Sequence, residues 1–176
     1  MVDSIPTLAS LELKPYLIEG QPPADLAGKV GIYAIFNEDQ ALQYIGYSRN
    51  VCLGLTQHLV RCPNQCHWFK VYTVARPSRR LLDEIRTAWL TEYGSVPPGN
   101  SDQQLMWEKP IDAKVFMTDT ERDAIANAEP ADTNKLLKQL ARRVEADVKA
   151  NVAARGAQIP IKFNPKLKAQ GLLALK

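Results

Sequence analysis

Residues 31–46 read GIYAIFNEDQALQYIG, and this stretch decides the fold of the chain. Two runs rich in residues that favour β-strands flank a polar turn at Asn37–Gln40, so a β-hairpin is predicted here. Side chains alternate between the two faces of a strand. Tyr33 on the first strand and Tyr44 on the second can therefore reach a shared face.

Composition limits the class of protein. The chain has 176 residues, of which 45% are hydrophobic and 23% charged, a balance typical of one globular domain with extensions. No apolar run approaches the ~20 residues of a membrane-spanning helix. The N-terminus has no basic region followed by an apolar core, so neither a membrane span nor a secretory signal is expected. Three cysteines, an odd number, favour a reduced cytoplasmic protein.

The positive charge is concentrated toward the C-terminus. Residues 131–176 contain 10 Lys and Arg against 3 Asp and Glu, a net charge of +7. The preceding 130 residues contain 12 Lys and Arg against 16 Asp and Glu, a net charge of −4. Such a basic segment can contact phosphates, and the alternative is a solvated helix face.

Hydrophobic spacing predicts the elements that follow the hairpin. Apolar residues at helical intervals indicate a helix over residues 51–60 and a second helix over residues 78–93. Alternating residues predict a third strand at 68–75, between these helices. A further short strand is predicted at 110–117.

The longest helical pattern lies near the C-terminus, over residues 132–155. Its apolar residues recur every four positions from Leu136 to Val152, and basic residues occupy the other faces. This apolar face must be buried on the domain, in a dimer or on a protein partner, and the pattern leaves these three open. Residues 157–176 are expected to form a loosely ordered basic tail.

Both ends of the hairpin carry a recognisable triplet. Gly31-Ile32-Tyr33 is followed about ten residues later by Tyr44-Ile45-Gly46, and both match the motif that names the GIY-YIG nuclease superfamily, which residues 28–100 resemble. The chain resembles in particular the nuclease-like N-terminal domain of plant chloroplast monothiol glutaredoxins, which indicates a cyanobacterial or plastid lineage. The residues that carry this second likeness are Gln43, Ile45-Gly46, Ser48-Arg49-Asn50 and Val96-Pro97-Pro98-Gly99-Asn100.

The resemblance implies a fold class and a division of the chain. It implies an α+β fold in which a small antiparallel sheet is flanked by helices, with an added C-terminal amphipathic helix and basic tail. Residues 1–29 are then an N-terminal arm, residues 30–128 the nuclease-like domain, and residues 129–176 the added helix and tail. The prolines of the arm prevent a long helix, so the arm is expected to pack irregularly on the domain.

By resemblance, the superfamily hydrolyses phosphodiester bonds with one divalent metal, here Mg²⁺ or Mn²⁺. Tyr33 and Tyr44 match the tyrosines near the attacking water and the scissile phosphate, and His58 matches a commonly polar position. The phosphate-binding arginine falls on Gly54 in this chain. Arg49 and Arg61 are the nearest replacements, although neither is expected at the same point in space.

The metal position differs as well. The pattern places Arg86 where the superfamily has its metal-binding glutamate, and an arginine repels a divalent cation. Glu84 is the close carboxylate upstream, about 200° around the helix from Arg86. It could serve as the metal ligand only if the alignment shifts. The resemblance therefore implies a degraded catalytic site.

Three functions follow from these observations. The first is a nucleic-acid-binding module without efficient cleavage, which uses the polar surface near the motif tyrosines and the basic C-terminal segment. Its basic candidates are Arg142, Arg143, Lys162, Lys166 and Lys168. The second is an active, divalent-metal-dependent DNA endonuclease with a rearranged site. The third is a protein-interaction or redox-linked module, which would use residues 136–152 as a dimer or partner face, or Cys62 and Cys66 as a redox pair.

Overall fold

The predicted hairpin forms the centre of the sheet. The computed structural model, which describes residues 4–176, has β2 at Gly31–Phe36 and β3 at Leu42–Ser48. β4, at Trp68–Thr73, pairs with the other side of β2, and the short β1, at Lys14–Pro15, extends the sheet beyond β4. The strand order is β1-β4-β2-β3 and every pair is antiparallel. The predicted α+β class with a small antiparallel sheet is confirmed.

Two helices cover the two faces of this sheet. α1, at Val51–Arg61, packs on the face that carries the motif tyrosines. α2, at Arg79–Tyr93, packs on the face that carries Ile32 and Ile45. Because β2 is covered on both faces, all of its residues are buried, which explains why its sequence is apolar without alternation.

Capping residues set the ends of these helices. Asn50 Oδ1 accepts a hydrogen bond from the backbone N–H of Leu53, and Ser78 Oγ accepts one from Leu81. Gly94 ends α2 in the left-handed conformation, with φ of 88°, which favours glycine. Both predicted helices are therefore present, with bounds that differ from the prediction by one residue.

The outer edge of β3 is covered by a loop. The Asn100 side chain accepts a hydrogen bond from the Ile45 N–H and donates one to the Ile45 carbonyl, both at 2.8 Å. Gly99 lies so close to the strand that a Cβ atom there would be 2.6 Å from the carbonyl oxygen of Gln43. This loop leads into the short helix that lies over the hairpin.

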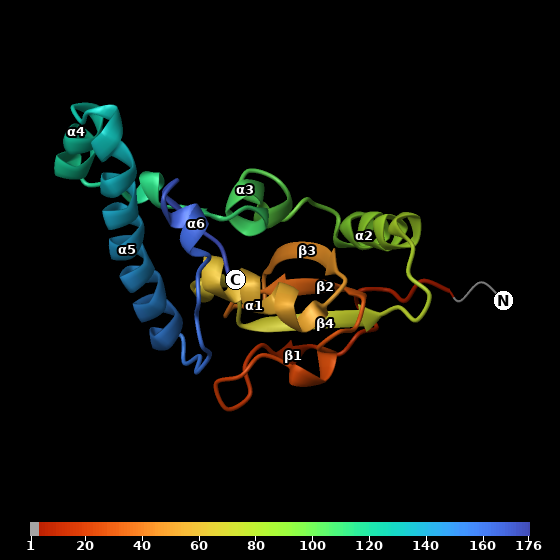
Figure 1. The fold of residues 1–176 in the computed structure, drawn as a ribbon. Helices are drawn as coiled ribbons and strands as arrows, with labels where there is room; N and C mark the ends of the chain where they lie inside the picture. The colour runs from red at the N-terminus through yellow and green to blue at the C-terminus, as the bar shows by residue number, and fades with distance from the viewer. Residues whose placement is uncertain (1–3) are drawn as a thin grey trace.

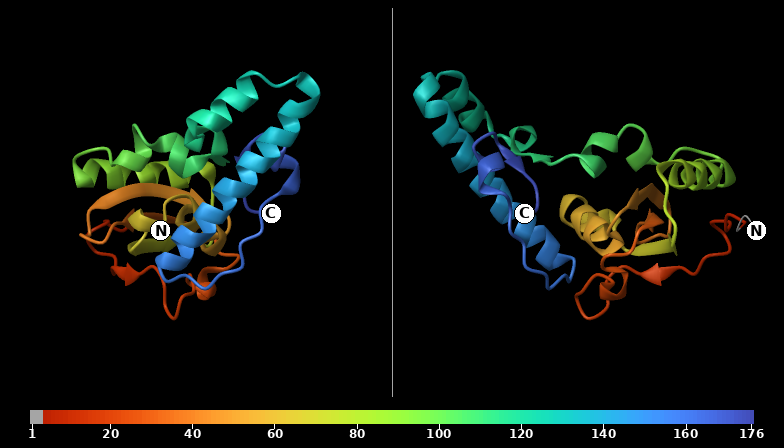
Figure 2. Two further views of the ribbon diagram at one scale, coloured as in Figure 1. Left: turned by 90° about the vertical axis from the view of Figure 1, so that its left-hand side faces the viewer. Right: turned by 45° about the vertical axis from the view of Figure 1, so that its right-hand side comes forward.

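The remaining elements complete the chain. They are α3 at Gln104–Glu108, β5 at Ile111–Asp112, α4 at Asp119–Ala126, α5 at Pro130–Ala154, α6 at Pro165–Lys168, β6 at Leu172–Leu173, and 3-10 turns at Ala24–Leu26, Pro63–Gln65, Pro98–Asn100 and Ala113–Phe116. Figures 1 and 2 show α4 and α5 as a helical pair on the side of the molecule away from α2. The strand predicted at 110–117 is correct only for β5, because the Asp112 side chain accepts a hydrogen bond from Lys114 N–H and begins a 3-10 turn.

The apolar face of α5 is buried within the chain. Leu140 and Ala141 belong to a cluster that includes Val60 from α1 and Phe163 and Leu173 from the C-terminal segment. Of the three ways to bury this face, the structure has the first, packing on the domain. This packing accounts for the buried part of the face, and a dimer or partner contact at 136–152 stays a prediction.

The C-terminal segment is ordered, and the expectation of a loose tail is wrong. The N–H of Gln158 donates to the carbonyl of Gly20 at 2.8 Å, and β6 pairs with β5. Phe163 and Leu173 are 5% and 1% exposed. Their burial against α5 offsets the entropy lost when the segment is ordered.

The N-terminal arm is irregular over most of its described length, as predicted. It is held to α2 by the Glu92 carboxylate, which accepts hydrogen bonds from the N–H groups of Leu8 and Ala9 at 2.7 and 2.9 Å. Met1–Asp3, where the predicted arm and the stretch without a secretory pattern begin, lie outside the described residues. Within residues 4–176, none of the helices has the length and apolar character needed to cross a membrane.

Candidate functional site

The two motif tyrosines lie side by side on one face of the sheet. Tyr33 pairs in register with Gly46, and Tyr44 pairs with Ile35, so both tyrosines point toward α1. Their ring centroids are 6.5 Å apart. The hairpin therefore places the pair together, as its sequence predicts.

Two glycines make room for these rings. A Cβ atom at Gly46 would lie 2.4 Å from the Tyr44 ring, which crosses this position. A Cβ atom at Gly54 would lie 2.9 Å from the Tyr33 hydroxyl and 3.1 Å from the Cβ atom of Ser48. Gly54, where the resemblance places an arginine, is thus the point at which α1 approaches the first tyrosine, and any side chain would displace the hydroxyl.

His58 completes the group from α1. Its Nε2 lies 2.9 Å from the Tyr33 hydroxyl, and its ring centroid lies 4.7 Å from that of Tyr44. Burial, together with nearby Arg61, lowers the pKa of His58 from 6.5 to about 3. Burial also raises the pKa of both tyrosine hydroxyls. At neutral pH these three side chains are therefore uncharged and lie together, with a hydrogen bond between Tyr33 and His58.

The short helix α3 covers this group. Trp107 is fully buried and stacks on Tyr44, with ring centroids 5.2 Å apart and an interplanar angle of 7°. The Tyr44 hydroxyl donates a hydrogen bond to Glu108 Oε1 at 3.1 Å. Tyr33 and Tyr44 are consequently only 2% and 5% exposed. They do not form the polar surface that was expected of them, because a helix distant in sequence lies over them.

Of the two proposed replacements for Gly54, Arg61 is the one whose charge acts on the tyrosines, and the charge of Arg86 on α2 acts on Tyr44 as well. Arg61 ends α1, and its Nη1 donates a hydrogen bond to the carbonyl of Trp107 at 2.8 Å. Burial lowers the pKa of Arg61, and the neighbouring tyrosine and glutamate side chains oppose that effect. Arg49, the other proposed replacement for Gly54, is exposed, and within residues 4–176 no hydrogen bond or ion pair joins it to the tyrosines.

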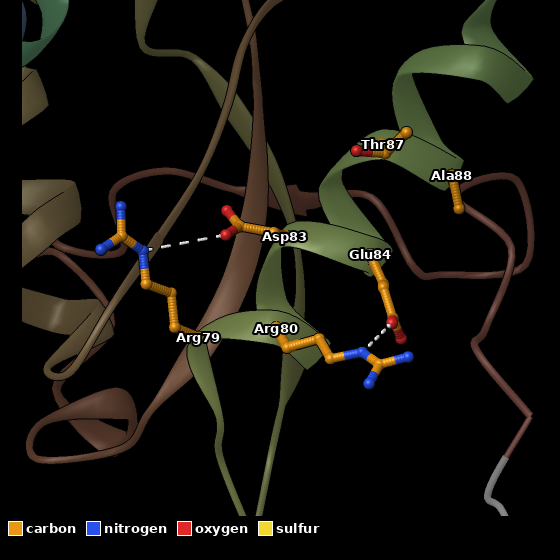
Figure 3. Close-up of a pocket in the computed structure, with 6 residues that line it drawn as sticks. All are labelled: Arg79, Arg80, Asp83, Glu84, Thr87 and Ala88. Carbon is orange, nitrogen blue, oxygen red and sulfur yellow. Dashed lines mark hydrogen bonds and ion pairs between the residues drawn. The ribbon is translucent and has the colours of Figure 1, made fainter.

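Glu84 lies away from this group. It belongs to α2, which covers the opposite face of the sheet, and its carboxylate accepts a hydrogen bond from Arg80 Nε at 2.8 Å on the surface of the helix (Figure 3). Arg86 lies over the Tyr47 ring, 5.2 Å from its centroid, and donates to Asp83 at 2.9 Å. No shift of alignment along this exposed helix face brings Glu84 to the tyrosine pair.

The residues around the tyrosines do not fit a divalent cation. Glu108 is the carboxylate that contacts them, and it is hydrogen-bonded by Tyr44 and Gln104 with the Arg61 guanidinium nearby. Across residues 4–176 there is no group of three or more His, Cys, Asp and Glu side chains that could hold a metal ion. These residues therefore supply no binding site through which Mg²⁺ or Mn²⁺ could act on a phosphodiester at this place.

The two candidate redox cysteines lie beneath the end of α1. Cys62 and Cys66 are 5% and 0% exposed, and both are free thiols. Burial raises the pKa of Cys62 to about 12 and that of Cys66 well above its ordinary value. Since the thiolate is the reactive form, this environment favours packing over redox chemistry.

The predicted nucleic-acid-binding residues differ in their contacts. Arg143 forms ion pairs with Glu121 and Asp147, and Lys168 forms one with Glu145 at 2.8 Å. The other three predicted residues are Arg142, Lys162 and Lys166. They are exposed, and within residues 4–176 they form no ion pair. The five residues do not gather at the tyrosine pair.

Two members of the buried group, Trp107 and Glu108, were not predicted from the sequence. Trp107 and Glu108 lie more than 60 residues beyond Tyr44, in a helix of one and a half turns that has no periodic signal. Arg61 was considered, but its reach to α3 depends on the tertiary position of that helix. The sequence feature that could have pointed to Trp107 is Gly99. A Cβ atom at that position would lie 2.9 Å from the Trp107 ring, so the turn needs a glycine there.

Comparison with known proteins gives a partial likeness. No protein-family model matches the chain. The chain is similar to a bifunctional monothiol glutaredoxin, described as chloroplastic, from Arabidopsis thaliana. The two are 30% identical over 104 residues, which make up 57% of this chain and 34% of that protein. The similarity thus spans about a third of the length of this relative.

Proposed function

We propose that this chain is a nucleic-acid-binding module on a GIY-YIG nuclease-like fold whose motif tyrosines do not support hydrolysis. The two triplets of the hairpin support the fold assignment, and the similarity to a chloroplast monothiol glutaredoxin agrees with it. In this proposal residues 1–29 are an arm, residues 30–128 the nuclease-like domain, and residues 129–176 the binding segment. A cytoplasmic or plastid location suits the same proposal.

The closed tyrosine group supports the absence of hydrolysis. A phosphodiester could reach Tyr33 and Tyr44 only if α3 moved away, which would break the stacking of Trp107 and the hydrogen bond to Glu108. The Tyr33 hydroxyl is hydrogen-bonded to the neutral imidazole of His58. The side chains of Tyr33, Tyr44 and His58 carry no charge with which to stabilise a pentacovalent phosphate.

The net charge of +7 over residues 131–176 is the observation that carries the binding function. The structure folds this segment into outer elements on which most of the Lys side chains are exposed. Each cation that neutralises a phosphate releases condensed counterions, so several exposed cations together give salt-dependent affinity.

The test is fluorescence anisotropy with labelled DNA duplex, single-stranded DNA and RNA at 50 to 300 mM salt. We expect binding whose Kd rises steeply with salt, with no cleavage of the probe. Absence of binding to every probe at 50 mM salt would refute the proposal. A Lys29→Gln variant, which removes one positive charge outside residues 129–176, should bind like the wild type.

A second candidate, an endonuclease with a rearranged site, is favoured by one observation. Arg61 and Glu108 bring a guanidinium and a carboxylate beside the tyrosine pair. Plasmid DNA incubated with the protein and Mg²⁺ or Mn²⁺ distinguishes the two candidates. Nicking that disappears in Tyr33→Phe and Tyr44→Phe variants would establish the enzyme and overturn the proposal of a binding module.

A further inference from the structure

The outer face of α5 carries a straight row of basic side chains. We call Lys135, Lys138, Arg142 and Lys149 the α5 row; all four are exposed. At about 100° per residue they fall within a sector of about 60° around the helix, and at 1.5 Å per residue the row is about 21 Å long. Three of its members were not among the residues that the sequence singled out for nucleic-acid binding.

This face points away from the body of the protein. The apolar side chains of α5 that are buried, such as Leu140 and Val144, lie on the opposite side of the helix, against α1 and the C-terminal segment. In Figures 1 and 2, α5 lies at one side of the molecule with these elements on its inner side. The α5 row is therefore accessible along its whole length.

The row keeps most of its positive charge. Glu145 lies at its margin and is shared by Lys149 and Lys168, at 3.2 and 2.8 Å. Asp147 lies on the other flank of the helix and pairs with Arg143. Within the described part of the chain, the three remaining members of the row form no ion pair.

We infer that the α5 row is the surface that contacts the phosphates of a double-stranded nucleic acid, an inference that rests on the proposed function. A rigid helix presents its cations at fixed intervals, which suits the regular phosphates of a duplex. Sequence-tolerant binding of single strands depends instead on aromatic side chains on which bases stack. α5 contains no aromatic residue, so the row can bind phosphates but cannot stack on bases.

An anionic membrane suits this face less well. A helix that lies in a bilayer surface places large apolar side chains beside its basic residues so that they enter the lipid. In α5 the large apolar side chains are buried or half-buried on the side away from the row, and the residues interspersed with the row are small or polar, such as Ala131, Gln139 and Ala146. The chemistry of the row is thus that of phosphate contact without insertion.

The experiment compares two charge-matched triple variants of the full chain. The first is Lys135→Gln with Lys138→Gln and Arg142→Gln, in the α5 row. The second is Lys162→Gln with Lys166→Gln and Lys176→Gln, in the C-terminal segment. Binding to a 24-base-pair DNA duplex is measured by anisotropy over a salt series, and circular dichroism with thermal melting checks that both variants fold.

The row variant should lose about 2.7 from the slope of log Kd against log salt, because each duplex phosphate contact contributes about 0.9. Its affinity at 0.1 M salt should fall on the order of 10²-fold, whereas the C-terminal variant should change little. If the wild type binds but the C-terminal variant alone loses the slope, the row is refuted and the proposed function stands. If the wild type binds no nucleic acid, both fail.

Two further arms test the choice of a duplex. Tighter binding of the wild type to a single strand of the same sequence, with that preference unchanged in the row variant, would overturn the inference. So would row-dependent sedimentation with phosphatidylserine vesicles in the absence of duplex binding. Preference for the duplex that is lost in the row variant supports the inference.

Discussion

Burial of His58 as a neutral imidazole makes the stability of this protein depend on pH. The pKa of His58 is lowered to about 3 in the folded chain and returns to its ordinary value of 6.5 on unfolding. Below pH 6.5 the unfolded chain therefore binds a proton that the folded chain does not. Stability contributed by this residue is present above pH 6.5 and is lost as the pH falls toward 3.

The magnitude follows from the two pKa values. Between pH 7 and pH 5 the unfolded imidazole becomes almost fully protonated while the folded one stays neutral, which removes about 2 kcal/mol of unfolding free energy. The measurement is urea unfolding followed by tryptophan fluorescence at both pH values. A His58→Gln variant should lack this loss, because glutamine can still hydrogen-bond the tyrosine hydroxyl but does not titrate.

The remaining histidine provides the control. The pKa of His67 is also lowered, mainly by partial burial, so a His67→Gln variant separates its contribution from that of His58. Carboxylates that titrate near pH 5 contribute equally in all three proteins. If the wild type and His58→Gln lose the same unfolding free energy between pH 7 and pH 5, His58 is not buried in the neutral form and the closed group is incorrect.

Three further predictions test the packing. Gly54→Ala should lower the unfolding free energy by about 1 to 2 kcal/mol, because the new methyl group contacts the Tyr33 hydroxyl. The loss should be smaller in a Tyr33→Phe background, so a double-mutant cycle measured by urea unfolding should show a coupling energy between the two positions. Asn100→Ala should cost about 2 to 4 kcal/mol because two backbone groups of Ile45 lose their partners, and calorimetry measures the lower Tm. Phe163→Ala should lower the unfolding free energy by about 3 to 5 kcal/mol and make the C-terminal segment sensitive to limited proteolysis. An unchanged Tm in the Asn100→Ala variant would contradict the hydrogen bonds to Ile45, and an unchanged Tm in the Phe163→Ala variant would contradict the burial of Phe163.

The sequence was informative wherever the determinants of structure are local. Each signal lies within a few residues of its element: β-favouring residues and the turn at Asn37–Gln40 for the hairpin, alternation for the third strand, and helical spacing for the two helices, whose ends Asn50, Ser78 and Gly94 set. These signals predict the hairpin, the third strand and the two helices that cover the sheet. The pairing of Tyr33 with Tyr44 follows as well, because the hairpin alone brings these residues to one face.

The burial of the tyrosines could not be predicted because it depends on α3. That helix has five residues, and only the path of the chain around β3 places Trp107 over the hairpin. The order of the C-terminal segment is likewise a tertiary effect. Phe163 and Leu173 resemble scattered apolar residues of a tail until the apolar face of α5 is known to lie beside them.

Asn100 gives the sheet a property that its strand order alone would not. An outermost strand ordinarily offers unpaired N–H and C=O groups to any extended chain, which is the first step of edge-to-edge aggregation and strand exchange. On β3 the asparagine side chain already occupies both groups of Ile45, and at the opposite edge β1 is only two residues long and contains Pro15, which has no N–H. These two features leave fewer free backbone groups at the edges of the sheet, which disfavours pairing with strands of neighbouring chains.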